Sequence, residues 1–325
     1  MPAHPSEGLG LMTVSFTGQR IALLGLGLIS GSLARALKAQ GWAGHITAWG
    51  PRAPSLEMGQ QLGVIDSWSL DLERVIQDAD MIVVGAPPIA TGDLLAELLP
   101  RLQSSSQRPV VTDLASIKGW VIERANCDYE GYIPGHPIAG SEDSGVRAAK
   151  ADLFMGREII LTPTEYTDPN ATAQVEAMWQ LSGARVSHLT VSDHDAALAA
   201  SSHSPHMVAY ALTMALADNP LAPFQHGGGA LRDMTRIAGS DPVMWRDIAV
   251  TNQRALLDAL NDVEAELARL KTLIKNADGA AMERYFQRCR EVRRANDTVL
   301  NPLTEIHSDS EIGSQPVAAK EISRS

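Results

Sequence analysis

The order of apolar and polar positions predicts alternating strands and helices in the first part of the chain. Four short segments, Ile21–Leu24, His45–Trp49, Met81–Gly85 and Val110–Asp113, have the length and apolar content of buried parallel strands. Segments with apolar residues at helical spacing lie between them, as at Asp93–Leu102. This alternation predicts an α/β fold with a doubly wound sheet, which binds its ligands at the carboxyl ends of the strands. Residues 159–162 and 184–189 are expected to be its final strands.

The pattern changes at about Thr190, after which no strand signal occurs. Asp193–Ala217 is rich in alanine and leucine, and Asp241 followed by Pro242 is typical of a helix start. Helical spacing continues through Asp258–Lys275 and Ala280–Arg294. The expected organisation is a flexible leader over 1–17, an α/β domain over 18–190, a helical domain over 191–300 and a disordered tail over 301–325.

Composition and charge narrow the class of protein. With 325 residues, 45% of them hydrophobic and 20% charged, the chain is long enough for two globular domains. The net charge of −11 argues against a nucleic-acid partner, and no segment has the length and apolarity of a membrane span. The two cysteines are far apart and the first twenty residues lack a signal-peptide pattern, so we expect a cytoplasmic protein.

A glycine-rich turn lies between the first strand and the first helix, in the stretch RIALLGLGLISGSLARAL. Gly25 permits a tight turn, Gly27 lets the backbone approach a pyrophosphate, and the helix that opens at Leu28 directs N–H groups at the phosphates. Serine replaces the third glycine of the dinucleotide-binding fingerprint. The alternative is a glycine-rich turn that binds no nucleotide. The expected cofactor contacts are Gly25, Gly27, Leu28, Ile29, Ser30 and Gly31.

The end of the second strand indicates which nicotinamide cofactor is used. NAD-specific versions of this fold carry an acidic residue there, and this chain has Gly50. Arg52 is placed to pair with a 2′-phosphate, and Pro87 follows the strand at Met81–Gly85. We therefore expect NADP to be preferred, with NAD possible. The alternative is that Arg52 is an exposed loop residue and either cofactor binds.

Polar residues gather in four further places, and each has a structural alternative. Ser116 lies in DLASIK, beside Asp113 and Lys118, where loop capping is common. His136 lies in the loop GHPIAGS, whose prolines and glycines predict irregular structure. A single histidine in a loop is more often structural than catalytic. Arg236 lies in GGGALRDMTRIA, where a surface salt bridge is the alternative.

The fourth place is the helical stretch that contains His194, His203 and His206. His203 and His206 share a helix face by their spacing, which makes a metal site conceivable. A third ligand is not evident and Pro205 stands between them, so we expect no metal.

Together, the motifs GLGLISGS, DLASIK, GHPIAGS, HD…SHSPH and GGGALRDMTRIAGSDPVMWRDI resemble the prephenate and arogenate dehydrogenases of tyrosine biosynthesis, also called cyclohexadienyl dehydrogenases. The resemblance runs from Gln19 to Asn276 in the order of the family. Ser30 in the glycine turn and Ser204 in SHSPH depart from its pattern. Neither departure removes a polar group that the chemistry would use.

The resemblance implies oxidative decarboxylation of prephenate and/or arogenate to 4-hydroxyphenylpyruvate and/or tyrosine, with hydride transfer to NAD(P)+. His136 would accept the proton of the C4 hydroxyl, Ser116 would orient that hydroxyl or His136, and Arg236 would hold the ring carboxylate. His206, with His194 nearby, would contact the substrate side chain. His203 and Arg232 would support the pocket.

The resemblance also implies a dinucleotide-binding domain over 18–190 and a substrate and dimerisation domain over 191–300, with a homodimer formed through the helices. Only the polar residues 301–325 follow, so no regulatory domain is expected, and any feedback by tyrosine would have to act at the active site. Two alternatives stay open: another hydroxyacid or imine oxidoreductase of the same build, and a non-catalytic nucleotide-sensing protein. The choice between prephenate and arogenate also stays open.

Overall fold

The computed structural model describes residues 16–140 and 143–300, and these form two compact units that divide between Val263 and Glu264. Of the predicted leader, residues 1–15 lie outside the described part, while Phe16 is buried and stacks on Trp42 with ring centroids 5.9 Å apart. The predicted tail over 301–325 also lies outside the described residues.

The first unit contains a parallel sheet with strand order β3-β2-β1-β4-β5-β6. The four strands predicted from apolar segments are confirmed. Two further strands, β3 and β6, are only three and two residues long, too short for any periodicity in the sequence to reveal. The strands are β1 (Arg20–Leu24), β2 (His45–Trp49), β3 (Ser67–Ser69), β4 (Met81–Val84), β5 (Val110–Asp113) and β6 (Tyr132–Ile133).

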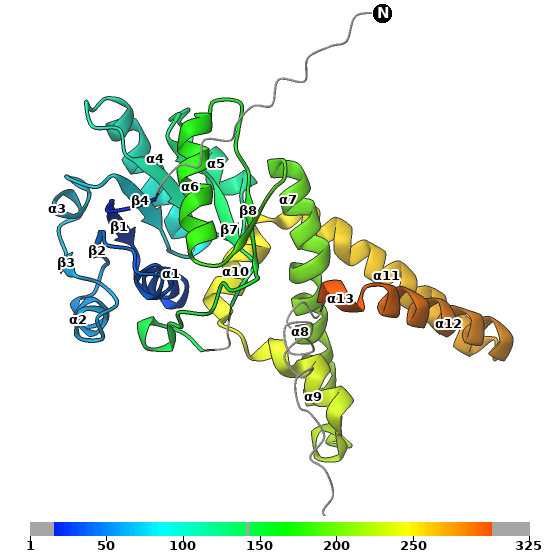
Figure 1. The fold of residues 1–325 in the computed structure, drawn as a ribbon. Helices are drawn as coiled ribbons and strands as arrows, with labels where there is room; N and C mark the ends of the chain where they lie inside the picture. Colours follow the sequence, from blue (N-terminus) through cyan, green and yellow to red (C-terminus); the bar gives the residue numbers. More distant parts are fainter. Residues whose placement is uncertain (1–15, 141–142, 301–325) are drawn as a thin grey trace, which may run out of the picture. The chain divides into compact units, whose positions relative to one another are not determined.

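Helices cover both faces of this sheet (Figure 1). Side chains of a strand alternate between the faces: Ile21 packs in the apolar cluster that contains Leu33 of α1, and Ala22 in the cluster that contains Leu98 of α4. The doubly wound arrangement is thereby confirmed. The helices are α1 (Leu28–Ala39), α2 (Ala53–Gln61), α3 (Leu72–Ile76), α4 (Pro88–Gln103), α5 (Gly119–Ala125) and α6 (Pro169–Leu181), and a short 3-10 turn covers Val146–Ala148.

A second sheet of three strands follows, which the sequence did not predict as separate. β7 (Gly135–Pro137) pairs antiparallel with β8 (Glu158–Leu161), and β8 pairs parallel with β9 (Arg185–His188). The expected strands at 159–162 and 184–189 therefore exist, but they belong to the three-stranded sheet with β7 and not to the main sheet. Pro134 separates β6 from β7 and has no N–H to donate, so the ladder of the main sheet ends there. The predicted irregular loop at GHPIAGS thus begins with a strand, and its Ser141 lies outside the described residues.

The rest of the first unit is helical, as predicted. A π-helical turn at Ala199–His203 separates α7 from α8, and Pro205 follows it in the first turn of α8. Because proline lacks an N–H, the wider turn before it accommodates the missing helical hydrogen bond. Asp241 caps α10 by accepting from the N–H groups of Val243 and Met244. The elements are α7 (Val191–Leu198), α8 (Ser204–Ala217), α9 (Gly229–Thr235), α10 (Pro242–Thr251) and α11 (Gln253–Lys275), with 3-10 turns at Pro223–His226 and Arg236–Gly239.

The second unit contains the end of α11, α12 (Gly279–Ala295) and α13 (Asp297–Leu300). The Tyr285 hydroxyl on α12 donates to Glu266 of α11 at 2.8 Å, and Arg269 lies over the Tyr285 ring. The helices predicted over 258–275 and 280–294 are confirmed. Among the described residues, no helix is long and apolar enough to cross a bilayer.

Gly25 and Gly27, in the turn after β1, differ in whether their positions can accept a side chain. Alanine substitutions at the two positions therefore form a matched pair. Gly25 has φ +100° and an added Cβ would lie 2.5 Å from the Gly85 carbonyl oxygen, whereas a Cβ at Gly27 would meet no atom within 4 Å. We predict that Gly25→Ala destabilises the protein by roughly 1–3 kcal/mol, while Gly27→Ala leaves the melting temperature unchanged. Thermal unfolding of both variants checks this, and equal melting temperatures would contradict it.

Candidate active site

The parallel strands place the predicted cofactor residues at one edge of the sheet. Gly25 follows β1, Gly50 follows β2 and Pro87 follows β4, and all three strands run in the same direction. The N–H of Gly31 makes the first helical bond, to the Gly27 carbonyl at 3.0 Å. The N–H groups of Leu28, Ile29 and Ser30 therefore precede the hydrogen-bonded part of α1 and are available to an anion. This geometry fits a pyrophosphate.

The serine that departs from the glycine fingerprint is accommodated by its neighbour. Ser30 is buried, and a Cβ added to Gly85 at the end of β4 would overlap its hydroxyl group. The missing glycine of the turn is thus compensated by Gly85 on the adjacent strand. Gly31 faces the protein instead, because an added Cβ would lie 3.0 Å from the Cβ of Ala149.

Arg52 is exposed and stands at the start of α2, two residues after Gly50. It therefore belongs to the same edge of the sheet as the glycine turn. Its guanidinium group is accessible to a ligand bound there.

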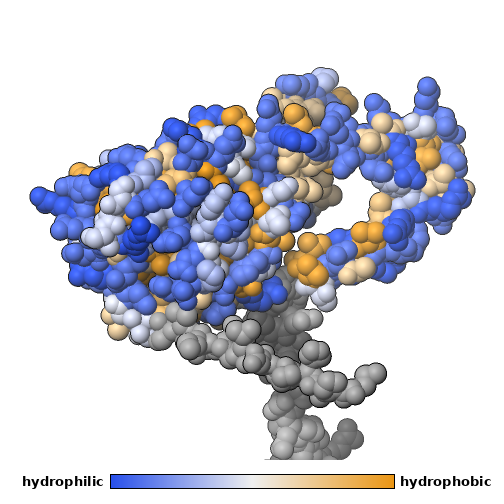
Figure 2. All heavy atoms as spheres, turned by 90° about the horizontal axis from the view of Figure 1, so that it is seen from above, coloured by the Kyte–Doolittle hydropathy of each residue, from blue (hydrophilic) through white to orange (hydrophobic). Residues whose placement is uncertain are grey.

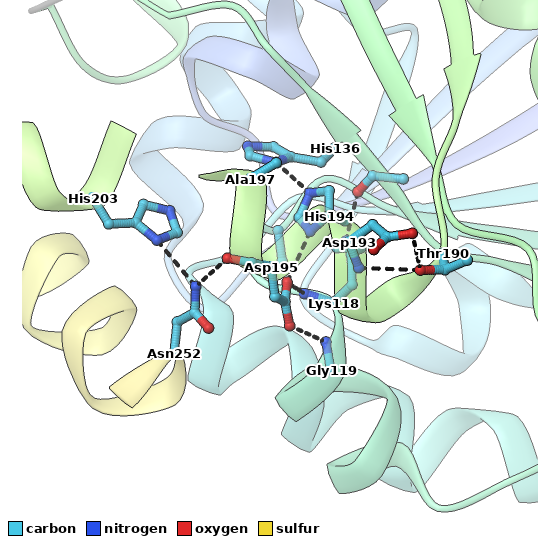
Figure 3. Close-up of polar contacts among 12 residues, drawn as sticks. Lys118, Gly119, His136, Thr190, Asp193, His194, Asp195, Ala197, His203 and Asn252 are labelled. Atoms are coloured by element: carbon cyan, nitrogen blue, oxygen red, sulfur yellow. Dashed lines mark hydrogen bonds and ion pairs between the residues drawn. The ribbon is translucent and has the colours of Figure 1, made fainter. Parts of the chain in front are cut away.

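His136 of β7 begins a chain of three hydrogen-bonded side chains that reaches from the sheet into the helical half of the first unit. Its Nδ1 lies 2.9 Å from Nε2 of His194, and Nδ1 of His194 lies 2.8 Å from Oδ1 of Asp195 (Figure 3). Both histidines are buried. His194 and Asp195 belong to α7, so the junction between sheet and helices is itself part of the site.

Asp195 is held as an ionised carboxylate. Its Oδ1 accepts from the backbone N–H of Lys118 at 2.9 Å, and its Oδ2 from that of Gly119 at 2.8 Å. Burial raises the pKa of Asp195, but the hydrogen bonds from His194 and from these two N–H groups outweigh it, and the pKa lies below its ordinary value. The carboxylate thereby caps the amino end of α5 from another element.

The ionised carboxylate places a proton on the nearer nitrogen of His194. Asp195 only accepts, so the His194 ring carries a proton on Nδ1, and its Nε2 is the atom that faces His136. When Nε2 of His194 accepts, His136 donates from Nδ1, and its own Nε2 is left as a proton acceptor. Burial first, then His194 and Lys118, hold the pKa of His136 well below its ordinary value, so this ring is neutral near pH 7.

The polar residues of DLASIK differ in burial: Asp113 and Lys118 are buried, and Ser116 is half-buried. Lys118 and Asp113 are completely buried and paired, and the Lys118 ammonium also donates to the carbonyl of Gly135, next to His136. Tyr132 donates to the other oxygen of Asp113 at 2.8 Å. Ser116 is half-buried on the same loop. The Asp–Lys pair is a structural anchor for β7.

The remaining predicted residues lie along α8 and the segment after it. His206 stacks on Trp245 of α10 with ring centroids 3.5 Å apart, and its Nδ1 donates to the Ser202 carbonyl at 2.9 Å. Burial first, and then the charge of Arg236, lower the pKa of His206, so Arg236 lies within electrostatic reach of this ring. Arg232 is exposed and its ion pair is with the adjacent Asp233.

His203 packs edge-on against the same Trp245, so His203 and His206 do share a face. Within the described ranges 16–140 and 143–300, no three His, Cys, Asp or Glu side chains gather as metal ligands.

Three contacts of the site were missed from the sequence. Asp195 stands next to His194 in the motif HD, and that adjacency is the signal that could have identified it. Trp245 and Asn252 gave no signal, because their partners are side chains and carbonyls of elements distant in sequence.

Comparisons with known proteins identify the family. Residues 33–188 match the family model for the prephenate dehydrogenase nucleotide-binding domain, and residues 190–288 match that for the prephenate dehydrogenase dimerization domain. The chain belongs to the prephenate dehydrogenase family. The family expected from the motifs is confirmed, and with it a dehydrogenase whose oxidative decarboxylation serves tyrosine biosynthesis.

Individual relatives span nearly the same length. The chain is 31% identical over 288 residues to a cyclohexadienyl dehydrogenase of Zymomonas mobilis, which covers 86% of this chain and 97% of the relative. A crystal structure of A. aeolicus prephenate dehydrogenase with hydroxyphenyl propionate and NAD+ has a TM-score of 0.81 at 31% identity, covering 86% and 99% of the two chains. For Synechocystis arogenate dehydrogenase the TM-score is 0.73 at 32% identity, covering 85% and 99%.

The neutral state of His136 makes a prediction about pH. Because its pKa lies well below the ordinary value of 6.5, acidification to pH 6.5 leaves the ring unprotonated. We predict that kcat/KM, which reports the ionisation of the free enzyme, stays constant from neutral pH down through 6.5 and falls only at lower pH. Steady-state kinetics across this range check it. A decline with its midpoint at or above 6.5 would contradict it.

Proposed function

We propose that His136 is the general base of the reaction and that its Nε2 accepts the proton of the substrate C4 hydroxyl. The observation that supports this is the chain from Asp195 through His194, which leaves Nε2 as the acceptor of a neutral imidazole. A bound nicotinamide supplies the hydride acceptor. Loss of the hydroxyl proton and the hydride turns C4 into a carbonyl carbon, and loss of CO₂ from C1 then makes the ring aromatic.

The other residues receive roles that suit their positions. Arg236 holds the ring carboxylate through its planar guanidinium group, and His206 contacts the substrate side chain. Ser116 hydrogen-bonds the C4 hydroxyl from the loop that follows β5. His194 is completely buried, so we assign it the orientation of His136. His203 and Arg232 support the pocket.

The substrate is prephenate, arogenate or both, because relatives of similar identity carry both names. The two substrates differ only in a keto or amino group on the side chain. Steady-state kinetics with each of them separates the possibilities.

The base assignment is tested by His136→Asn. Asparagine preserves a polar side chain of similar reach but cannot accept the proton, so kcat should fall by about 10²–10⁴-fold while cofactor affinity and the fold persist. The matched control is His45→Asn, at the amino end of β2 and therefore at the opposite edge of the sheet. A His136→Asn variant that turns over at the wild-type rate would refute the assignment.

We also propose that NADP is the preferred cofactor. Gly50 offers no carboxylate to a ribose 2′-hydroxyl or against a 2′-phosphate, and the exposed Arg52 is placed to pair with that phosphate. The A. aeolicus relative was crystallised with NAD+. The proposal for this chain rests on Gly50 and Arg52 alone.

Arg52→Ala measures that choice. We predict that kcat/KM for NADP falls roughly 10- to 100-fold, the worth of one charge-assisted hydrogen-bonded contact, and that the value for NAD is unchanged. Arg74→Ala, at an exposed arginine of α3, is the control. A wild-type preference for NAD, or an unchanged ratio in Arg52→Ala, would contradict the proposal.

A homodimer formed through the helical half is our proposal for the assembly. The matched dimerization-domain description covers residues 190–288, and large apolar side chains such as Val250 and Leu257 are exposed on α10 and α11. The largely hydrophilic surface is interrupted by hydrophobic patches (Figure 2). Cytoplasmic location stays a prediction, and whether tyrosine inhibits at the active site stays open.

A further inference from the structure

The buried side-chain amide of Asn252 connects Asp195, which hydrogen-bonds His194, to a further histidine, His203. Asn252 follows α10 directly and is buried. Its Nδ2 lies 2.9 Å from the backbone carbonyl oxygen of Asp195 and 3.2 Å from Nδ1 of His203. Figure 3 shows the Asn252 side chain between these two partners.

The carbonyl of Asp195 fixes which end of the amide points at His203. A carbonyl oxygen only accepts, so the group at 2.9 Å from it must be the NH₂ and not the amide oxygen. The same NH₂ group faces His203, and it can only donate. Nδ1 of His203 is therefore a hydrogen-bond acceptor.

An accepting Nδ1 defines the state of the whole ring. Burial, partly offset by Asp195, lowers the pKa of His203 to about 4, so the ring is neutral near pH 7. A neutral imidazole with a bare Nδ1 carries its proton on Nε2. His203 thus has the opposite hydrogen-bonding polarity to the base, His136, whose Nε2 is bare.

The two histidines belong to one electrostatic cluster. His203 contributes to lowering the pKa of His136, and its ring contacts Trp245, on which His206 stacks. Asp195 carries both connections, since its carboxylate orients His194 and its carbonyl holds Asn252.

We propose that Asn252 is a positioning residue for the reaction, which holds His203 in the Nε2–H tautomer and ties that donor to the residue that orients the base. The proposal rests on the proposed function, in which His136 is the base. In this proposal the neutral ring of His136 accepts a hydrogen bond at Nε2, and the neutral ring of His203 donates one from Nε2. A substrate oxygen is the class of group that such an N–H donor suits.

The decisive variant is Asn252→Asp, which keeps the size of the side chain but replaces the donor with an acceptor. A carboxylate beside Nδ1 of His203 favours a proton on that atom, so the tautomer should invert and the ring should titrate above pH 4. Asn261→Asp, the same substitution at an exposed position of α11, is the matched control.

Ring ¹⁵N spectra of the full chain labelled at histidine read the tautomer directly, with the His203 signals assigned by their loss in His203→Asn. We expect Nε2–H in wild type and in Asn261→Asp, and a proton on Nδ1 in Asn252→Asp. Turnover of Asn252→Asp should fall about tenfold or more, with cofactor affinity unchanged.

Three results would overturn the proposal: a proton on Nδ1 of His203 in wild type, an unaltered tautomer in Asn252→Asp, or an inverted tautomer with wild-type turnover. The first needs no variant, so the test stands even if Asn252→Asp does not fold. A failure of the base assignment is seen separately, as full turnover in His136→Asn, and does not affect the tautomer measurement.

Discussion

The carboxylate of Asp195 is the contact on which the order of the site depends. It accepts from two backbone N–H groups at the start of α5 and from the ring of His194, so one side chain joins the nucleotide-binding sheet to the helical half. The approach is close: a Cβ on Gly119 would lie 2.8 Å from Oδ2. The absence of a side chain at Gly119 therefore permits the close approach of the carboxylate that holds a proton on Nδ1 of His194.

A buried ion pair between Lys118 and Asp113 supports the His136 end of the hydrogen-bonded series Asp195–His194–His136. Lys118 and Asp113 have no exposed side-chain surface, and breaking such a pair by removing one partner typically costs about 3–5 kcal/mol. The Lys118 ammonium holds the Gly135 carbonyl while its backbone N–H holds Asp195. Lys118 thus anchors both the strand that carries His136, the proposed base, and the carboxylate of Asp195. These contacts explain why DLASIK, GHP and HD lie far apart in sequence yet form one site.

Much of the fold could be predicted from the sequence, because local patterns determine it. The glycine turn after β1, the long apolar strands and the helical second half are properties of neighbouring residues. The strands β3 and β6 were missed because they are too short to show a period. The assignment of β8 and β9 to the main sheet was wrong because their partner, β7, begins only after Pro134. The compensation of Ser30 by Gly85 depends on the packing of α1 against β4, which no local pattern encodes.

The site was predictable in its residue types and not in its connections. His136, His194 and His203 came from motifs, and the structure places them in one cluster. Asn252 lies 57 residues beyond Asp195 and contacts its backbone carbonyl, so nothing in either segment signals the pairing. The direction of each hydrogen bond likewise follows from which atoms meet in three dimensions.

The central claim is that Asp195, acting through His194, determines the proton-accepting state of His136. Replacing Asp195 with asparagine removes the charge while keeping the shape. The most direct measurement is kcat of the single variant Asp195→Asn and of the double variant that also carries His136→Asn. We predict that Asp195→Asn lowers kcat by about 10²–10⁴-fold with little change in KM, and that the double variant is no slower than His136→Asn, because the residues act as a unit. A near wild-type kcat in Asp195→Asn, or losses that multiply in the double variant, would contradict the claim.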